Sequence, residues 1–171
     1  DTTGFAHTAD LSEASLVAAA RTAAVGAASA GEPGRVVDLG RVDATNPSRV
    51  EVYPEDIDKA TKVALLQRAE EAARGEGGAI SQVSARYADS RRRILVANSD
   101  GALAEDDQVR SMFSVSTVAT GDTGMQTGRE SIGHTIGFEL FDTHDVGELA
   151  QRAARRALTK LAARPAPSGE M

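Results

Sequence analysis

The stretch from Ala79 to Thr120 constrains the fold more than any other part of the sequence. In 79–87 and in 109–118, small or apolar residues alternate with polar ones, and 93–97 is largely apolar. Because side chains of a strand point alternately to opposite faces, this period of two predicts β-strands. The residues expected to share a face are Ala79, Ser81, Val83, Ala85 and Tyr87 in the first segment, and Val109, Ser111, Phe113, Val115 and Thr117 in the last.

Polar interruptions between these segments predict the turns of an antiparallel meander of at least three strands. They are Asp89-Ser90, Asn98-Ser99-Asp100-Gly101 and a charged bend at Glu105-Asp106-Asp107. Asp-Gly favours a turn because Gly adopts positive φ without steric cost. A further hairpin is expected at Gly121-Asp122-Thr123-Gly124, and a strand near His134 to Leu140 would close the sheet.

Three segments repeat apolar residues at helical spacing. A short strand through Phe5 and His7 precedes the first, where Asp10 and Glu13 match a capping box and Ser12 is the alternative N-cap. The second would begin at Pro54, which a first helical turn tolerates, and the third near Asp142 or Thr143. The expected apolar stripes are Leu16, Ala20, Ala23, Ala24 and Ala27; Ile57, Ala60, Val63, Leu66, Ala69 and Ala73; and Val146, Leu149, Ala150, Ala153, Ala157 and Leu161.

The order of these elements predicts the fold class. The strands follow one another without helices between them, which disfavours a parallel sheet built from crossovers. Residues 35–53 would be an extended connection with little regular structure. We therefore expect an α+β fold, a mostly antiparallel sheet with helices packed on one face in two layers. Aromatic residues make up only 4% and Trp is absent, so Ala would supply much of a thin core.

Composition and charge exclude several classes of function. A net charge of −6 argues against a general nucleic-acid binder, since phosphate binding needs concentrated Lys and Arg. The sequence has no Cys, which excludes disulfides, thiolate nucleophiles and thiolate metal sites within this chain. No apolar run approaches the roughly 20 residues of a membrane span, so a cytoplasmic protein is the expectation.

The segment Arg129-Glu130-Ser131-Ile132-Gly133-His134 invites comparison with a zinc-binding helix. Such a helix needs two imidazoles one turn apart, and Arg129 stands where one of them would be. A guanidinium has no free lone pair and repels a cation. The flanking Gly128, Gly133 and Gly137 also disfavour a helix, so we expect a loop or a strand edge here.

The remaining polar clusters have plain structural interpretations. His7, His134 and His144 are far apart in sequence and would form a site only if the fold brought them together with carboxylates. The carboxylates 105–107 lack the ligand spacing of a calcium loop, and Arg91-Arg92-Arg93 would be split between the two faces of a strand.

The glycine-rich turns 75–78 and 121–124 lack the Lys-Ser/Thr pair of a phosphate loop. The hydroxyl-rich strand Ser111 to Thr120 lacks a nucleophile elbow. These patterns assign no catalytic, cofactor-binding or metal-binding residue.

Four segments in order resemble the N-terminal domain of the TldD/PmbA family, zinc metallopeptidases also called modulators of DNA gyrase. They are Thr3 to Ser12 with its Gly-Phe-Ala, Ile94 to Gly101 with its Asp-Gly turn, Gly137-Phe138-Glu139, and Ala157 to Met171 with its Ala-Pro-Ser-Gly. The resemblance implies an N-terminal domain over 1–164, entered partway, and a linker over 165–171. The family's His-Glu-x-x-x-His zinc motif would follow that linker, so no metal ligand is carried onto this chain, and zinc is expected only in the longer protein.

The hypothesis is therefore a non-catalytic domain of a zinc metallopeptidase that processes unstructured peptides, acting as scaffold, substrate gate and dimer interface. The resemblance implies a homodimer or a heterodimer with a related chain, an extended peptide substrate, and neither direct nucleic-acid binding nor membrane association. A stand-alone binding or regulatory module acting through a sheet edge is the alternative. A third possibility is a small enzyme built on His7, His134 or His144.

Overall fold

The computed structural model describes residues 3–27, 36–42, 49–164 and 169. The chain divides into two compact units. The first contains Asp1–Gly40 and Asn98–Ala102, and the second contains Arg41–Ala97 and Leu103–Met171. The second unit carries the helix-covered sheet and therefore the candidate site.

The first unit contains helix α1 (Glu13–Ala27). Its N-cap is Ser12, whose Oγ accepts the N–H of Ser15 at 3.4 Å, so the alternative cap is the one used. The predicted strand through Phe5 and His7 is wrong, because residues 3–10 form no strand. Instead the chain passes close to the helix at Gly4, where a Cβ would lie 1.7 Å from the carbonyl oxygen of Ala23. The half-buried face of α1 is Ser15, Ala19, Ala23 and Ala27, which differs from the predicted stripe.

The sheet of the second unit is organised around β3 (Ala102–Gly121). This strand pairs antiparallel with β2 (Ile80–Ala97) and with β4 (Gly124–His134). The short strand β1 (Gly40–Val42) also belongs to the sheet and pairs with β3. β2 and β4 therefore lie on either side of β3, and β2 is an end strand of the described sheet.

Two predicted turns are confirmed. The hairpin at 121–124 joins β3 to β4, and Gly124 has a φ of 106° that only glycine adopts readily. The turn at 98–101 joins β2 to β3, and Gly101 there has a φ of 86°. The Asn98 side chain fixes this turn by accepting the N–H groups of Asp100 and Ala102.

Three predictions about the strands are wrong. Asp89-Ser90 does not interrupt the chain, because β2 continues through it paired with Arg110 and Ser111 of β3. The carboxylates 105–107 lie within β3 rather than in a bend, paired with 93–95. The last strand is Gly124–His134 rather than 134–140, and residues 135–139 turn into the short helix α3 (Leu140–Thr143). In each place polar or glycine residues on a strand suggested a break that backbone pairing overrides.

The two long helices of the second unit, α2 and α4, begin at aspartate caps. Pro54–Asp56 forms a separate 3-10 turn, η2, and α2 (Lys59–Arg74) begins only after Asp58, whose side chain accepts the N–H of Thr61 at 2.8 Å. The predicted start at Pro54 is therefore wrong. Helix α4 (Val146–Ala162) begins after Asp145, which accepts the N–H of Glu148 at 2.9 Å.

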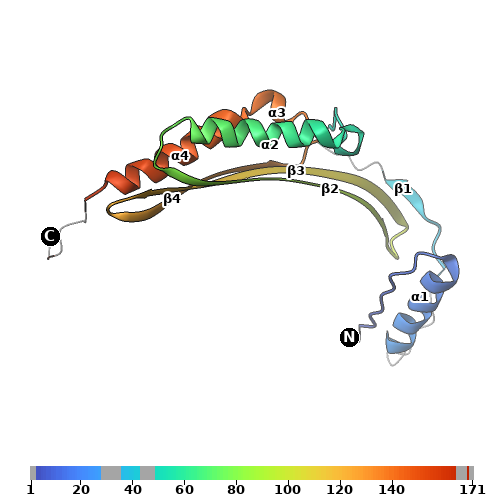
Figure 1. The fold of residues 1–171 in the computed structure, drawn as a ribbon. Coiled ribbons are helices and arrows are strands. Elements are labelled where there is room, and N and C mark those ends of the chain that lie inside the picture. The colour runs from blue at the N-terminus through green and yellow to red at the C-terminus, as the bar shows by residue number, and fades with distance from the viewer. Residues whose placement is uncertain (1–2, 28–35, 43–48, 165–168, 170–171) are drawn as a thin grey trace. The chain divides into compact units, whose positions relative to one another are not determined.

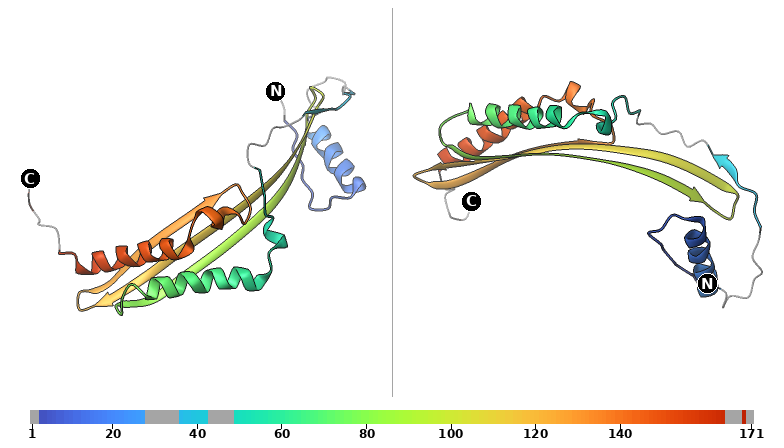
Figure 2. Two further views of the ribbon diagram at one scale, coloured as in Figure 1. Left: turned by 90° about the horizontal axis from the view of Figure 1, so that it is seen from above. Right: turned by 45° about the vertical axis from the view of Figure 1, so that its right-hand side comes forward.

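Helices α2 and α4 lie side by side on one face of the sheet, on the convex side of the bowed strands (Figure 1). Seen from above, α2 follows β2 and α4 follows β4 (Figure 2). The residues of β3 that were expected to share a face do so, and Val109, Ser111, Phe113, Val115 and Thr117 are all buried. The buried core of the two layers is Leu65, Ala69, Ala73, Ile80, Phe113, Val115, Ala119, Val146, Leu149, Ala150, Ala153, Ala154 and Ala157. The predicted α+β fold with helices on one face of a mostly antiparallel sheet is confirmed.

The contact between α4 and β4 depends on small residues on both sides. Ala150, Ala153, Ala154 and Ala157 are fully buried on α4. Opposite them, a Cβ at Gly128 would lie 1.9 Å from the carbonyl oxygen of Ala153 and 2.8 Å from the backbone nitrogen of Ala157. The alanine stripe therefore brings the helix backbone against the strand itself.

Replacing Gly128 with Ala should force α4 away from the sheet. We expect the free energy of unfolding to fall by about 1–3 kcal/mol, because overpacking displaces a whole helix here. Urea denaturation of both proteins measures the difference. Gly78→Ala is the matched control, because a Cβ there meets no atom within 4 Å. An unchanged stability for Gly128→Ala would contradict the close approach of α4 to β4.

Candidate functional site: the uncovered sheet face and its bracing contacts

The fold brings two of the three histidines together. The rings of His134, at the end of β4, and His144, just before α4, have centroids 5.7 Å apart. The Nδ1 atom of His144 also lies 2.9 Å from Oγ1 of Thr143 and 3.2 Å from the carbonyl oxygen of Leu140. Sequence separation gave no sign of this pairing. In the described part of the chain, however, no three His, Asp or Glu side chains converge to hold a metal ion.

The segment Arg129 to His134 lies on β4, so the predicted strand edge is confirmed and the zinc-helix interpretation is not. Successive residues face opposite sides of the sheet. Glu130 faces the helix layer, where its Oε1 lies 2.8 Å from Nη2 of Arg156 on α4. Arg129 therefore faces the opposite side.

The arginines 91–93 are split between the two faces, as predicted. Arg91 and Arg93 lie opposite Val109 and Asp107, on the side of the helix layer. Arg92 lies opposite Gln108 and faces the other way. Among the three carboxylates of 105–107, only Asp106 shares the face of Arg92.

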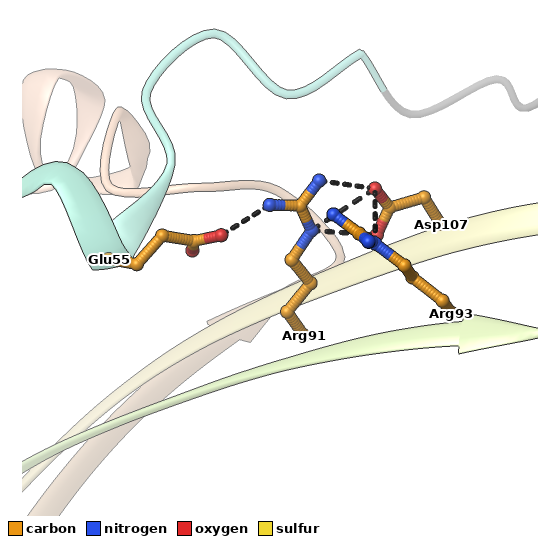
Figure 3. Close-up of polar contacts among 4 residues, drawn as sticks. All are labelled: Glu55, Arg91, Arg93 and Asp107. Carbon is orange, nitrogen blue, oxygen red and sulfur yellow. Dashed lines mark hydrogen bonds and ion pairs between the residues drawn. The ribbon is translucent and has the colours of Figure 1, made fainter. Parts of the chain in front are cut away.

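Arg91 is the centre of an ion-pair network that joins the 3-10 turn to the sheet (Figure 3). Its Nε donates to both carboxylate oxygens of Asp107, at 2.9 and 3.1 Å, and its Nη1 donates to Glu55 of η2. The guanidinium also lies over the ring of Tyr53, 4.3 Å from the centroid. Arg93 adds a longer ion pair of 4.0 Å to Asp107. The network therefore joins η2 to β2 and β3.

The charges of this network stabilise one another. Hydrogen bonds from Arg91 hold the pKa of Asp107 below its usual value. The pKa of Glu55 is lowered too, first by its own backbone N–H and then by Arg91. The same partners, Asp107 before Glu55, raise the pKa of Arg91. All three groups therefore stay ionised near neutral pH, as a bracing contact requires.

A second anchor is the carboxylate of Glu139, which gathers backbone donors from two segments. Its Oε1 accepts the N–H of Gly137 at 2.8 Å and that of Glu51 at 3.3 Å, and its Oε2 accepts the N–H of Val52 at 3.0 Å. Burial alone would raise the pKa of Glu139, but the backbone N–H groups of Gly137, Glu139 itself, Val52 and Glu51 together lower it. The Gly-Phe-Glu sequence at 137–139 thus fixes residues 51–52 beside the turn before α3.

The face of the sheet opposite the helices has no helix over it in the second unit (Figures 1 and 2). We call it the open face and define it by the alternate residues from Ser84 to Ile94 on β2, from Asp106 to Val118 on β3, and from Thr127 to Gly133 on β4. Hydroxyl groups and arginines predominate on it. This face and the end strand β2 are two surfaces of the unit that are open to a partner.

The structure thus defines a class: a two-layer α+β domain in which α2 and α4 pack on one face of the sheet and leave the opposite face without a helix of the same unit. Residues 52–161 match the family model of the PmbA/TldA metallopeptidase central domain. Because the match covers more than half of the chain, the protein belongs to the PmbA/TldD family of metallopeptidases.

Two relatives support this assignment by sequence. A metalloprotease of Methanothermobacter thermautotrophicus is 35% identical over 116 residues, which cover 68% of this chain and 25% of the relative. The metalloprotease slr0863 of Synechocystis sp. is 32% identical over 108 residues, covering 63% of this chain and 23% of the relative. The matched residues thus span about a quarter of the length of these curated relatives.

Two crystal structures have the same fold. One is a proposed modulator of a DNA gyrase from Thermotoga maritima, with a TM-score of 0.75 and 16% identity over 98% of this chain and 37% of that one. The other, from Bacteroides thetaiotaomicron, has the same description, a TM-score of 0.67 and 18% identity over 95% of this chain and 38% of that one. At these identities the likeness concerns the fold alone.

The family name implies a metal, but the described residues do not fit one, because no three candidate ligands converge among them. No step of catalysis is therefore assigned to these side chains. Within the described ranges, no helix combines the length and the apolar character that crossing a bilayer requires. The domain limits 1–164 and 165–171 and the N-terminal position stay predictions.

Replacing Arg91 with Gln should loosen the 3-10 turn without unfolding the domain. The N–H groups of Asp56 and Ile57, which bond to the carbonyls of Tyr53 and Pro54, should exchange several-fold faster with deuterium. Hydrogen exchange followed by NMR measures this. Arg92→Gln, on the open face, should leave both amides unchanged, and an equal effect of the two substitutions would contradict the bracing role.

Replacing Glu139 with Gln should destabilise the protein in a pH-dependent way. The folded pKa of Glu139 lies below its ordinary 4.5, so its contribution is complete above that pH and is lost as pH falls through the folded pKa. We expect a loss of about 1–3 kcal/mol at pH 7, which shrinks below pH 4.5. Urea denaturation across this pH range measures it. The exposed Glu71→Gln is the control and should show no such trend.

Proposed function

We propose that this chain is a non-catalytic domain of a PmbA/TldD-like zinc metallopeptidase that processes unstructured peptides. In this proposal residues 1–164 form the domain ahead of the catalytic half and residues 165–171 form the linker toward it. The domain acts as scaffold, as substrate gate and as part of the interface of a homodimer or of a heterodimer with a related chain. Zinc belongs to the catalytic half.

The single observation that carries the proposal is the family match over 52–161. The architecture is compatible with each role. The close, alanine-rich packing of two helices on the sheet supports the scaffold role, and β2 presents an end strand of 18 residues. An unpaired strand edge offers backbone donors and acceptors to an extended peptide or to a partner strand.

A stand-alone binding or regulatory module remains the second candidate, favoured by the same free edge. It would use β2 in the same way but would have no peptidase partner. The two candidates make different predictions for the longer polypeptide. Only the peptidase domain requires a catalytic half whose activity depends on this domain.

The proposal predicts that the purified 171-residue chain neither binds zinc stoichiometrically nor cleaves an unfolded peptide. Equilibrium dialysis with Zn²⁺ and incubation with a reduced, alkylated protein substrate measure these two properties. A polypeptide that also carries the catalytic half should cleave the same substrate and serves as the positive control. Tight zinc binding at one ion per chain, or cleavage by the chain alone, would refute a non-catalytic domain. A full-length protein whose cleavage is unaffected by deletion of this domain would favour the stand-alone module.

A further inference from the structure

The open face carries a charge opposite to that of the whole chain. Its described residues include Arg86, Arg92, Arg110 and Arg129 but only one carboxylate, Asp106. The complete chain, by contrast, has a net charge of −6. Positive charge is therefore concentrated on the sheet face that α2 and α4 do not cover.

These four arginines are exposed, and no ion pair joins their side chains to another residue in the described part of the second unit. On the helix side, Arg91 and Arg156 are paired with Asp107 and Glu130. The guanidinium groups of the open face thus keep their forked donors available for carboxylates, which they bind in a bidentate manner.

The arginines are spaced along the strands rather than clustered at one point. Their positions can be compared through the β3 residues that they pair with. Arg129 of β4 pairs with Ser116. On β2, Arg86 pairs with Ser114 and Arg92 with Gln108. With a rise of about 3.3 Å per residue, the distance from Ser116 to Gln108 is about 26 Å. An extended peptide of about eight residues has the same length, so its side chains could meet the arginines in succession.

Between the arginines the side chains are mostly small, and several can form hydrogen bonds with a peptide backbone. Ala88, Met112 and Gly133 form one row across the three strands, and serines flank it on both sides. Small side chains let a polypeptide approach the sheet, and serine hydroxyls donate to and accept from peptide groups. Met112 is 43% exposed and can adapt its shape to varied partners.

These features favour a polypeptide over a nucleic acid. Binding of single strands relies on bases stacking on aromatic side chains, and the open face has none among its described residues. The net charge of −6 also repels a long polyanion at a distance, whereas a short acidic segment meets mainly the local arginines.

We propose that the open face binds extended polypeptide segments in which Asp and Glu are clustered. This inference rests on the proposed role as a substrate gate and specifies its substrate class. Acidic segments are among the least able to fold by themselves, because their charges repel and little apolar surface is buried. A gate that selects for them would select unfolded chains by their charge.

The test measures peptide binding to the 171-residue chain by fluorescence anisotropy. Three disordered peptides of equal length are compared: one with Glu at alternate positions, one with Gln and one with Lys in their place. At low salt the Glu peptide should bind at least about tenfold more tightly than the Gln peptide. This advantage should decline as salt screens the charges.

Substitution locates the binding surface. Arg86→Gln combined with Arg110→Gln should reduce the affinity for the Glu peptide to that for the Gln peptide. The matched control is Arg74→Gln combined with Arg152→Gln, on the helix layer, which should leave it unchanged. All four sites are exposed, and thermal unfolding checks that both variants fold.

Each other outcome has a definite meaning. Equal affinity for the Glu and Gln peptides would overturn the charge selection and leave the substrate gate standing. Tighter binding of a single-stranded oligonucleotide than of the Glu peptide would overturn the inference in favour of nucleic acid. Failure to bind any of the three peptides would overturn both the inference and the gate.

Discussion

The structure depends on the burial of one face of β3 beneath two helices. Alternate residues from Val109 to Ala119 are buried, and they form the floor on which α2 and α4 lie. Most of the residues that α2 and α4 contribute to this core are alanines, so the layers must come very close to gain enough contact. Gly128 permits this approach on the strand side. A thin core of this kind is sensitive to the addition of single methyl groups.

The asymmetry of the sheet follows from the same arrangement. Because the helices occupy one face, every second residue of the strands is left to the other side. Acidic and basic residues on the covered side neutralise one another in pairs such as Arg91 with Asp107 and Arg156 with Glu130. The open face keeps arginines without such partners among the described residues. The open face is therefore positively charged although the whole chain has a net negative charge.

Periodicity predicted the two layers and the inward face of α4, but not that of α2, where Val63 of the expected stripe is exposed and Leu65 is buried instead. The alternation in 109–118 grouped the residues of β3 that share a face, which is the buried one, and the stripe from Val146 to Leu161 matches the inward face of α4. The family resemblance was also confirmed by the match over 52–161. These signals succeed because burial imposes a regular pattern on the side chains.

The sequence signal failed where pairing between distant segments decides the structure. Asp89-Ser90 resembled a turn, yet their backbone pairs with Arg110 and Ser111 across the sheet. The roles of Arg91 and Glu139 depend on residues 16 positions and more than 80 positions away, respectively, so no local motif indicates them. The open face could be predicted as half of an alternating pattern, but its charge required the register of three strands.

The bowed strands have two zones of different cohesion. Beneath the helices the side chains of the strands are held by apolar burial, whereas around Arg91 and Asp107 they make partly exposed ionic contacts (Figure 3). Ionic contacts of this kind are weak individually and are sensitive to dissolved salt. High salt should therefore weaken the side-chain contacts of the outer zone more than those beneath the helices, while the backbone pairing of β2 with β3 runs through both.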